Sequence, residues 1–80
     1  MPKFPCPCCG HKTLASRGEY DICPVCFWED DPEAYSAPEE TLGCNGVSLA
    51  RAQRNYQAFG ACTEAMLPHV RAPREKDVHL

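Results

Sequence analysis

Two pairs of closely spaced cysteines constrain what this chain can fold into more than any other feature. Cys6 and Cys9 form the first pair, Cys23 and Cys26 form the second, and 13 residues lie between the pairs. Paired C-x-x-C turns at this separation are typical of a four-thiolate metal site, because each turn can point two sulfurs at one ion. The sequence therefore predicts a tetrahedral metal site in which these four cysteines are the ligands.

The other residues of the two turns agree with this interpretation. Pro7 and Pro24 fix the backbone angle φ inside the turns, and Gly10 can adopt the positive φ that the chain needs on leaving the first turn. The alternative is a pair of disulfides, or free structural thiols. It is the weaker interpretation, because seven cysteines cannot all pair and the first residues contain no apolar run resembling a secretion signal. We therefore expect a cytoplasmic protein.

The length of the chain makes a bound metal important for folding. A chain of 80 residues buries too little apolar surface to offset about 1.5 kcal/mol of ordering entropy per residue. A structural zinc ion contributes about 10 to 16 kcal/mol of apparent binding free energy, which becomes folding free energy when the unfolded chain has no site. We expect one metal-stabilised domain over residues 1–70, followed by a disordered tail over residues 71–80.

The remaining pattern predicts a small α+β fold. Residues 12–16 and 20–22 look like two short strands around a turn, so we expect a zinc-ribbon or rubredoxin-like β-hairpin that links the two C-P-x-C knuckles. Residues 49–59 repeat apolar side chains at helical spacing, with Ser48 as the N-cap and Gly60 just after the end. The predicted fold is thus a metal-stabilised hairpin with one main helix packed against it.

Two more segments complete the expected structure. Residues 30–40 are acidic and contain prolines, which predicts a solvated connector; the alternative is that Ala34 and Tyr35 dock back onto the ribbon. Residues 61–67 predict a short helical stretch capped by Thr63 and closed by Pro68. The side chains expected to complete the core are Met66, Leu67 and Val70.

Three cysteines lie outside the predicted ligand set. Cys8 is inside the first turn and cannot easily point at the same ion as both neighbours, so we expect an exposed thiol or an alternate ligand. Cys44 and Cys62 are most simply small buried residues. A thiol-redox function would need an exposed thiol of low pKa with a resolving partner, and the sequence shows none. We expect His11, beside the first turn, to be exposed.

The charges of the two halves differ in sign. Residues 1–40 carry three basic and eight acidic side chains, a net charge of −5, whereas residues 41–80 carry five basic and three acidic ones, a net charge of +2. Four thiolates on a divalent ion add about −2 to the first half. The predicted ribbon should therefore repel phosphate backbones, which disfavours nucleic acid as a partner.

Partner-binding residues are predicted at two places. Phe27 and Trp28 are expected mainly to cover the metal site and to form the seam with the helix, with a partner-facing Trp28 as the alternative. The polar face of the helix carries further candidates at spacings of three and four, namely Arg51, Arg54 and Asn55.

We do not expect an enzyme. The sequence shows no Ser/His/Asp arrangement, glycine-rich phosphate loop or carboxylate pair in an apolar setting. Four thiolates also close a zinc site and leave no position for a reactive water.

The sequence resembles the bacterial cysteine-rich CPCC family from about residue 4 to residue 70. The resemblance rests on CPCCG at residues 6–10, CPVCFWEDD at residues 23–31, and NGVSL, AQRNY and FG within residues 45–60. It implies a small cytosolic protein with a zinc-ribbon-like beginning, and it implies no particular biochemical activity.

The two cysteine turns also resemble rubredoxin, which holds iron in four thiolates and transfers electrons. Rubredoxin has glycine after the second turn, whereas Phe27 occupies that place here. Zinc is therefore the expected ion, with iron as the alternative. The leading hypothesis is a zinc-binding protein-interaction or regulatory module, the second a nucleic-acid-binding zinc ribbon, and the third a rubredoxin-like electron carrier.

Overall fold

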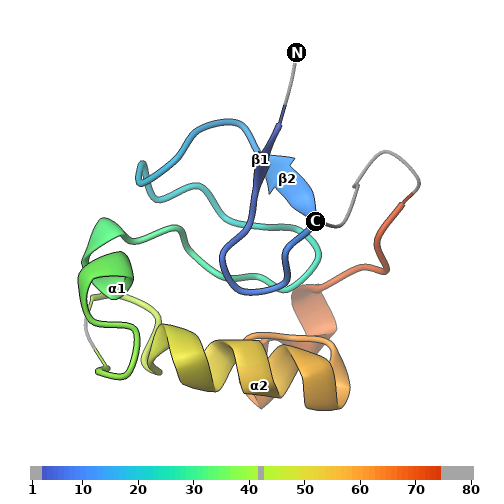
Figure 1. Ribbon diagram of the computed structural model, residues 1–80. Coiled ribbons are helices and arrows are strands. Elements are labelled where there is room, and N and C mark those ends of the chain that lie inside the picture. Colours follow the sequence, from blue (N-terminus) through green and yellow to red (C-terminus); the bar gives the residue numbers. More distant parts are fainter. Residues whose placement is uncertain (1–2, 42, 75–80) are drawn as a thin grey trace.

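The computed structural model describes residues 3–41 and 43–74 and confirms a small metal-stabilised type of α+β fold. Strands β1 (Phe4–Pro5) and β2 (Lys12–Leu14) form an antiparallel pair, and helices α1 (Pro32–Ser36) and α2 (Leu49–Phe59) follow. A 3-10 helix, η1 (Glu64–His69), comes last. In Figure 1 the irregular N-terminal ribbon lies on one side of α2, and the chain after α2 turns back toward the ribbon.

The hairpin runs through the first knuckle and does not link the two knuckles. Phe4 pairs with Leu14 and Pro5 with Lys12, so the paired strands flank residues 6–11. The second knuckle is closed in the same way by a single bridge between Ile22 and Glu29. The predicted pairing of residues 12–16 with residues 20–22 is wrong, because each knuckle turns the chain back on itself and pairs its own flanks.

Residues 15–21 instead form a loop that a carboxylate holds together. Asp21 Oδ2 accepts hydrogen bonds from the backbone N–H of Ser16 at 3.1 Å and from its hydroxyl at 2.9 Å. These side-chain bonds replace the strand ladder that the alternating sequence pattern predicted.

Helix α1 lies within the stretch that was expected to be a solvated connector. Asp31 is its N-cap and accepts from the backbone N–H of Glu33 at 2.9 Å, while Pro32 occupies the first helical position. Proline opposes a helix interior but is compatible with the first turn, where its missing N–H is not needed. Asp30 and Asp31 are buried, which contradicts the solvated connector. Of the two residues in the docking alternative, Ala34 is buried against the core and Tyr35 is 38% exposed.

Helix α2 has the bounds that the sequence predicted. The Ser48 hydroxyl accepts from the backbone N–H of Arg51 at 3.0 Å, and Gly60 ends the helix with φ of +88°. Leu49 and Ala52 are buried, and Tyr56 packs against the same core. The apolar stripe of α2 therefore covers the ribbon, as its periodicity indicates.

The segment after α2 differs in detail from the prediction. It forms the 3-10 helix η1, Thr63 precedes it without a side-chain capping bond, and Pro68 lies inside it. Met66 packs on the core and Val70 is half-buried, but Leu67 is 42% exposed, so the prediction of a core Leu67 is wrong. A 3-10 helix has three residues per turn, and this points Leu67 away from the face that Met66 occupies.

The chain after η1 returns to the second knuckle. The backbone N–H of Arg71 donates to the carbonyl of Pro24 at 3.1 Å. Arg71 is the first residue of the tail that was predicted to be disordered; the disorder of this tail stays a prediction, and residues 75–80 lie outside the described part of the chain.

Gly43 and Gly46 offer a test of the buried carboxylate. Both have positive φ, +75° and +76°, but a Cβ at Gly43 would collide with the Asp31 carboxylate, whereas a Cβ at Gly46 would meet nothing within 4 Å. We expect Gly46→Ala to lower the free energy of unfolding by about 1 kcal/mol and Gly43→Ala by about 3 kcal/mol, because only the latter also displaces Asp31 from its hydrogen bonds. Denaturant unfolding of the metal-loaded protein measures both values, and equal losses would contradict the role of Asp31.

Candidate metal centre

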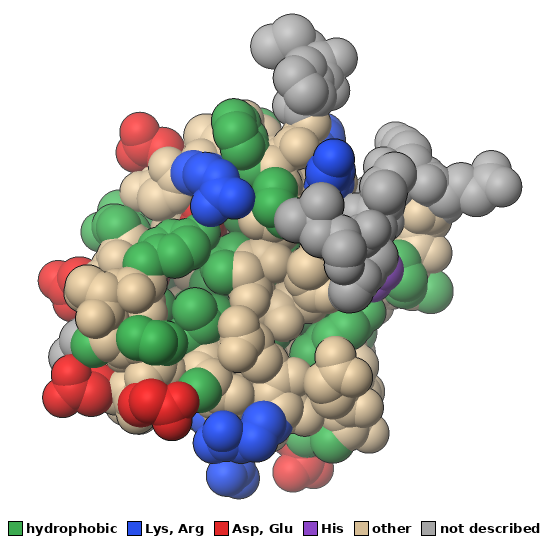
Figure 2. Space-filling model, viewed as in Figure 1, with side chains coloured by type: hydrophobic (Ala, Val, Ile, Leu, Met, Phe, Trp, Pro, Cys, Tyr) green, Lys and Arg blue, Asp and Glu red, His purple; other side chains and the backbone are tan. Residues whose placement is uncertain are grey.

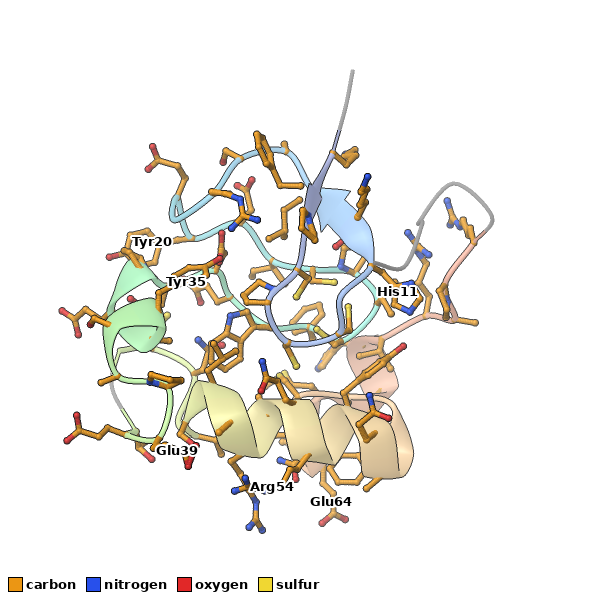
Figure 3. The ribbon with its side chains drawn as sticks, viewed as in Figure 1. His11, Tyr20, Tyr35, Glu39, Arg54 and Glu64 are labelled. Carbon is orange, nitrogen blue, oxygen red and sulfur yellow. The ribbon has the colours of Figure 1, made fainter. Side chains whose placement is uncertain are left out.

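The two knuckles bring four sulfur atoms together in the middle of the molecule. The Sγ atoms of Cys6, Cys9, Cys23 and Cys26 all lie within 4.8 Å of one another, and all four residues are buried. Two contacts cross between the knuckles: Cys6 Sγ lies 3.5 Å from Cys26 Sγ, and Cys9 Sγ lies 3.7 Å from Cys23 Sγ. In Figure 3 the sulfur atoms gather between the ribbon and α2. The structure thus clusters the four cysteines that the sequence predicted as ligands.

The separation of the sulfurs fits one metal ion. Four sulfurs placed tetrahedrally about 2.3 Å from an ion lie about 3.8 Å from one another. The two contacts of 3.5 and 3.7 Å are close to this value. They are much longer than a disulfide bond, which is about 2.05 Å. The four thiols could therefore hold a metal ion, and a tetrahedral sulfur site accepts zinc or iron.

The two knuckles share one backbone geometry. In each knuckle the residue after the second cysteine is left-handed, with φ of +82° at Gly10 and +68° at Phe27. The N–H of Gly10 donates to the carbonyl of Cys6 at 2.8 Å, and the N–H of Phe27 donates to that of Cys23 at 2.7 Å. A left-handed residue other than glycine costs about 1 to 2 kcal/mol. Phe27 stacks on His69 with ring centroids 5.2 Å apart, a contact that offsets part of this cost.

Thr13 is a site residue that the sequence analysis missed. Its side chain is buried, and its hydroxyl donates a hydrogen bond to Cys23 Sγ at 2.9 Å. Donors of this kind orient metal ligands and stabilise the thiolate. No local motif marks Thr13, because its role depends on β2 passing beside the second knuckle.

The sulfurs cannot all carry negative charge without a cation. Hydrogen bonds from Cys26, Cys6 and Cys9, and from Thr13, lower the pKa of Cys23. The interaction with Cys23 in turn raises the pKa of Cys6 and of Cys26. A bound cation would stabilise all four thiolates together, so binding should release protons and weaken as the pH falls.

Trp28 covers the centre and does not face a partner. Its side chain is fully buried in the core that contains the four cysteines, as expected of a residue that covers the metal site. The alternative prediction of a partner-facing Trp28 is therefore wrong. Among the described residues, Nε1 of Trp28 is buried without a hydrogen-bond partner. Burial of an indole ring contributes about 4 to 6 kcal/mol, which outweighs the roughly 1 to 3 kcal/mol lost by an unpaired donor.

The three candidates on α2 divide into two groups. Arg51 and Arg54 are exposed, as predicted. Asn55 is half-buried and donates from Nδ2 to the carbonyl of Cys62 at 2.9 Å. Its amide therefore holds the chain after α2, and a partner-binding role for Asn55 stays a prediction.

The remaining cysteines and His11 are placed differently from several predictions. Cys62 is buried, as expected. Cys8 is also buried, which contradicts the alternative of an exposed thiol. Cys44 is exposed, so the prediction of a buried Cys44 is wrong. Cys44 lies in an irregular loop, where its backbone N–H donates to Asp31 Oδ2 at 3.1 Å. His11 is half-buried with its ring edge against Tyr56, with centroids 6.2 Å apart, and it is not part of the sulfur cluster.

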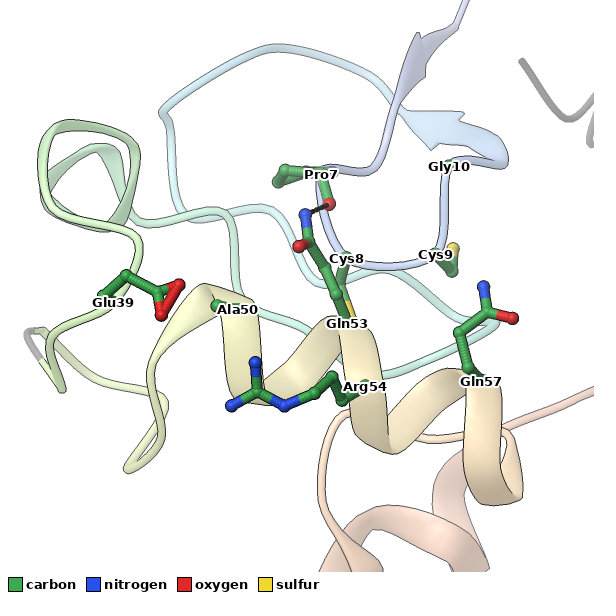
Figure 4. A pocket seen from close by; sticks show the side chains of 9 residues that line it. All are labelled: Pro7, Cys8, Cys9, Gly10, Glu39, Ala50, Gln53, Arg54 and Gln57. Atoms are coloured by element: carbon green, nitrogen blue, oxygen red, sulfur yellow. Dashed lines mark hydrogen bonds between the residues drawn. The ribbon is translucent and has the colours of Figure 1, made fainter.

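A shallow groove of about 540 Å³ lies beside the first knuckle. Figure 4 shows Gln53 and Gln57 of α2 pointing toward the knuckle, whereas Arg54 runs along the helix toward the side on which Glu39 lies. Gln53 Nε2 donates to the carbonyl of Pro7 at 2.8 Å. This bond fixes the knuckle against α2.

Replacement of Thr13 tests its contribution to the metal site. We expect Thr13→Val, which keeps the shape but removes the hydroxyl donor, to weaken metal binding about tenfold. Thr13→Ser is the matched control, because it keeps the hydroxyl and should bind the metal as the unaltered protein does. Competition with a chelator of known affinity measures the difference, and an unchanged affinity in Thr13→Val would rule out this role.

Cys44 should be an unreactive thiol at neutral pH although it is exposed. Loss of surrounding water, together with the carboxylates of Glu29 and Asp31, raises its pKa to about 11. The neutral thiol therefore predominates until the pH approaches 11, and we expect alkylation by iodoacetamide to accelerate about tenfold per pH unit up to that value. Mass mapping of the modified peptide measures the rate. Glu29→Gln should raise the alkylation rate at pH 7, and the control Glu39→Gln should leave it unchanged. An alkylation rate that stops rising near pH 9 would contradict the raised pKa of Cys44.

Comparison with known proteins agrees with this centre. A search of curated proteins found no significant match to the sequence. The profile of one protein family, described as cysteine-rich CPCC, matches residues 4–77 and so includes both knuckles, α1, α2 and η1. Because this match covers most of the chain, the protein belongs to the cysteine-rich CPCC family.

Proposed function

We propose that this protein is a zinc-stabilised interaction module of the cytoplasm that binds another protein and performs no catalysis. The observation that carries the proposal is the buried cluster of four sulfurs at tetrahedral separation. An ion in this cluster would hold both knuckles in place and would supply the folding free energy that a small core lacks.

Zinc is the proposed ion. The donor set suits zinc or iron, but the left-handed position at the end of the second knuckle holds Phe27, where the iron protein that these turns resemble has glycine. Iron would colour the purified protein red, whereas zinc would leave it colourless.

A structural role for the ion is favoured by the closure of the site. Four protein sulfurs fill a tetrahedral coordination shell, so no position is left for a water or substrate. The raised pKa of the Cys44 thiol, about 11, also argues against Cys44 as a nucleophile, because only the thiolate is reactive.

Binding of another protein is supported by the apolar surface. Large apolar side chains that a core would normally cover are 38–51% exposed, namely Phe4, Tyr20, Ile22, Tyr35 and Leu67. Apolar and aromatic groups gathered at a surface are typical of protein-binding sites. Within residues 3–41 and 43–74, no helix has the length and apolarity needed to cross a membrane.

A nucleic-acid-binding ribbon is the second candidate. Arg51 and Arg54 are exposed on α2, which favours it. Figure 2 shows basic side chains together below α2 and acidic side chains around the edge near α1. Binding to nucleic acid should weaken steeply with added salt, so a flat salt response in a titration with single- or double-stranded oligonucleotides would exclude this candidate.

Replacement of a clustered cysteine tests the proposed function. We expect Cys9→Ser to lose the ion and to unfold the ribbon, because three thiolates no longer hold zinc tightly and the core depends on it. Cys44→Ser is the matched control, since Cys44 is exposed and outside the cluster. Elemental analysis and thermal melting should show one zinc per chain in the control and little zinc, with no cooperative transition, in Cys9→Ser. Full occupancy and an unchanged melting temperature in Cys9→Ser would overturn the zinc module.

A further inference from the structure

A second, smaller pocket lies away from the groove at the first knuckle. It has a volume of about 110 Å³ and lies between the second knuckle and η1. Its apolar lining includes Ile22, Phe27 and Met66. The polar groups at this pocket include Glu29 and Asn45, so it combines an apolar wall with a carboxylate.

The structure holds the carboxylate-bearing residue firmly in place. Asn45 Oδ1 accepts from the backbone N–H of Glu29 at 2.9 Å, and Asn45 Nδ2 donates to the carbonyl of Glu29 at 2.9 Å. Ile22 pairs with Glu29 from the other side in the bridge that closes the second knuckle. The backbone of Glu29 is therefore fixed by two partners, and its carboxylate lies beside the Cys44 thiol, with no ion pair found within the described residues. A site built in this way is preorganised for a ligand.

The chemistry of the pocket matches an amphipathic cation. A lysine side chain has an apolar stem that packs on apolar walls and a charged end that seeks a carboxylate. Ile22, Phe27 and Met66 would contact the stem, and Glu29 would receive the ammonium group.

The surface next to the pocket is negative as well. Tyr20 is 51% exposed, and the carboxylates of Asp31 and Glu33, and of Glu29, raise the pKa of its hydroxyl. A cation would be attracted both by these carboxylates and by the face of the tyrosine ring. Arg17 is a positive charge on this side of the molecule: its guanidinium lies over the ring of Phe4, 5.8 Å from the ring centroid, and it opposes the rise in the pKa of the Tyr35 hydroxyl.

One buried residue fixes Tyr20 and Tyr35 in their exposed positions. The carbonyl of Asp30 accepts from the backbone N–H of Tyr20 at 3.1 Å, and its carboxylate accepts from the hydroxyl of Tyr35 at 2.6 Å and from the N–H of Gly18 at 2.7 Å. Figure 3 shows the two tyrosines at the edge of the molecule beside α1. This surface therefore offers two exposed aromatic side chains to a partner, of which Tyr35 is held in place by its hydroxyl.

We propose that the pocket receives a lysine side chain from a basic segment of a partner protein, with Glu29 as the residue that recognises the charge. The inference rests on the proposed interaction module and names the surface that it uses and the chemistry of its partner.

A peptide titration tests the charge recognition without altering the protein. The probe is a short peptide with lysines in an alanine and leucine background, added to the zinc-loaded full chain and followed by amide shifts in NMR spectra. The comparison peptide carries acetylated lysines, which keep the stem and lose the charge. We expect binding that weakens about fivefold on acetylation, with the largest shifts at Ile22, Glu29 and Asn45. Equal affinity of the two peptides would overturn the proposal.

Variants of the protein locate the site. Glu29→Gln should lower the affinity of the protein for the lysine peptide about fivefold, because it removes only the charge. Glu39→Gln is the matched control, since Glu39 lies at the groove beside the first knuckle, and it should leave the affinity unchanged. Tyr20→Ala should weaken binding by a smaller factor. A larger loss in Glu39→Gln than in Glu29→Gln would assign the peptide to the other groove and overturn the proposal.

The same measurements separate this inference from the proposed function. Self-association of the protein, abolished by replacement of Arg51 and Arg54, would identify a second copy as the occupant and overturn the lysine assignment. Failure of the peptide to bind, while zinc content and melting behave as expected for Cys9→Ser and its control, would also overturn the pocket assignment and leave the zinc module standing. If Cys9→Ser keeps its zinc and its melting temperature, the zinc module is overturned whether or not the peptide binds.

Discussion

The mutual repulsion of four converging thiolates is the constraint on which the rest of the structure depends. Sulfurs 3.5 to 3.7 Å apart in a buried site cannot all ionise unless a cation balances them. Both knuckles, the short strand pairs at their flanks and the Trp28 ring that covers the cluster take their positions from this convergence. The regular secondary structure of the ribbon is too short to hold itself together, since an isolated two-stranded hairpin is marginal in water.

Carboxylates organise the half of the molecule that lies away from the sulfurs. Asp30 and Asp31 are both buried and bind backbone N–H groups of loops that have no strand partner. Asp31 also requires glycine at position 43, and Asp30 fixes the exposed tyrosines. This small protein thus contains both a sulfur cluster that could hold a metal ion and a loop network built on buried carboxylates.

Local features of this protein could be predicted from sequence, and features that depend on distant contacts could not. The knuckles and α2 follow from the spacing of cysteines, from Ser48 and from Gly60, all of which act within a few residues. The pairing of β1 with β2, the burial of Asp30 and Asp31, and the exposure of Cys44 depend on segments that meet only in the folded chain. An acidic run with prolines looks solvated in sequence, because nothing in it reveals that loop N–H groups will surround the carboxylates.

The hydrogen bond from the N–H of Cys62 to the carbonyl of Cys26, 2.8 Å long, has a consequence for how the protein is made. The segment around Cys62, which packs on the second knuckle, leaves the ribosome well after the knuckle itself. A nascent chain therefore exposes its thiols to oxidants and to competing metals until the C-terminal third has emerged.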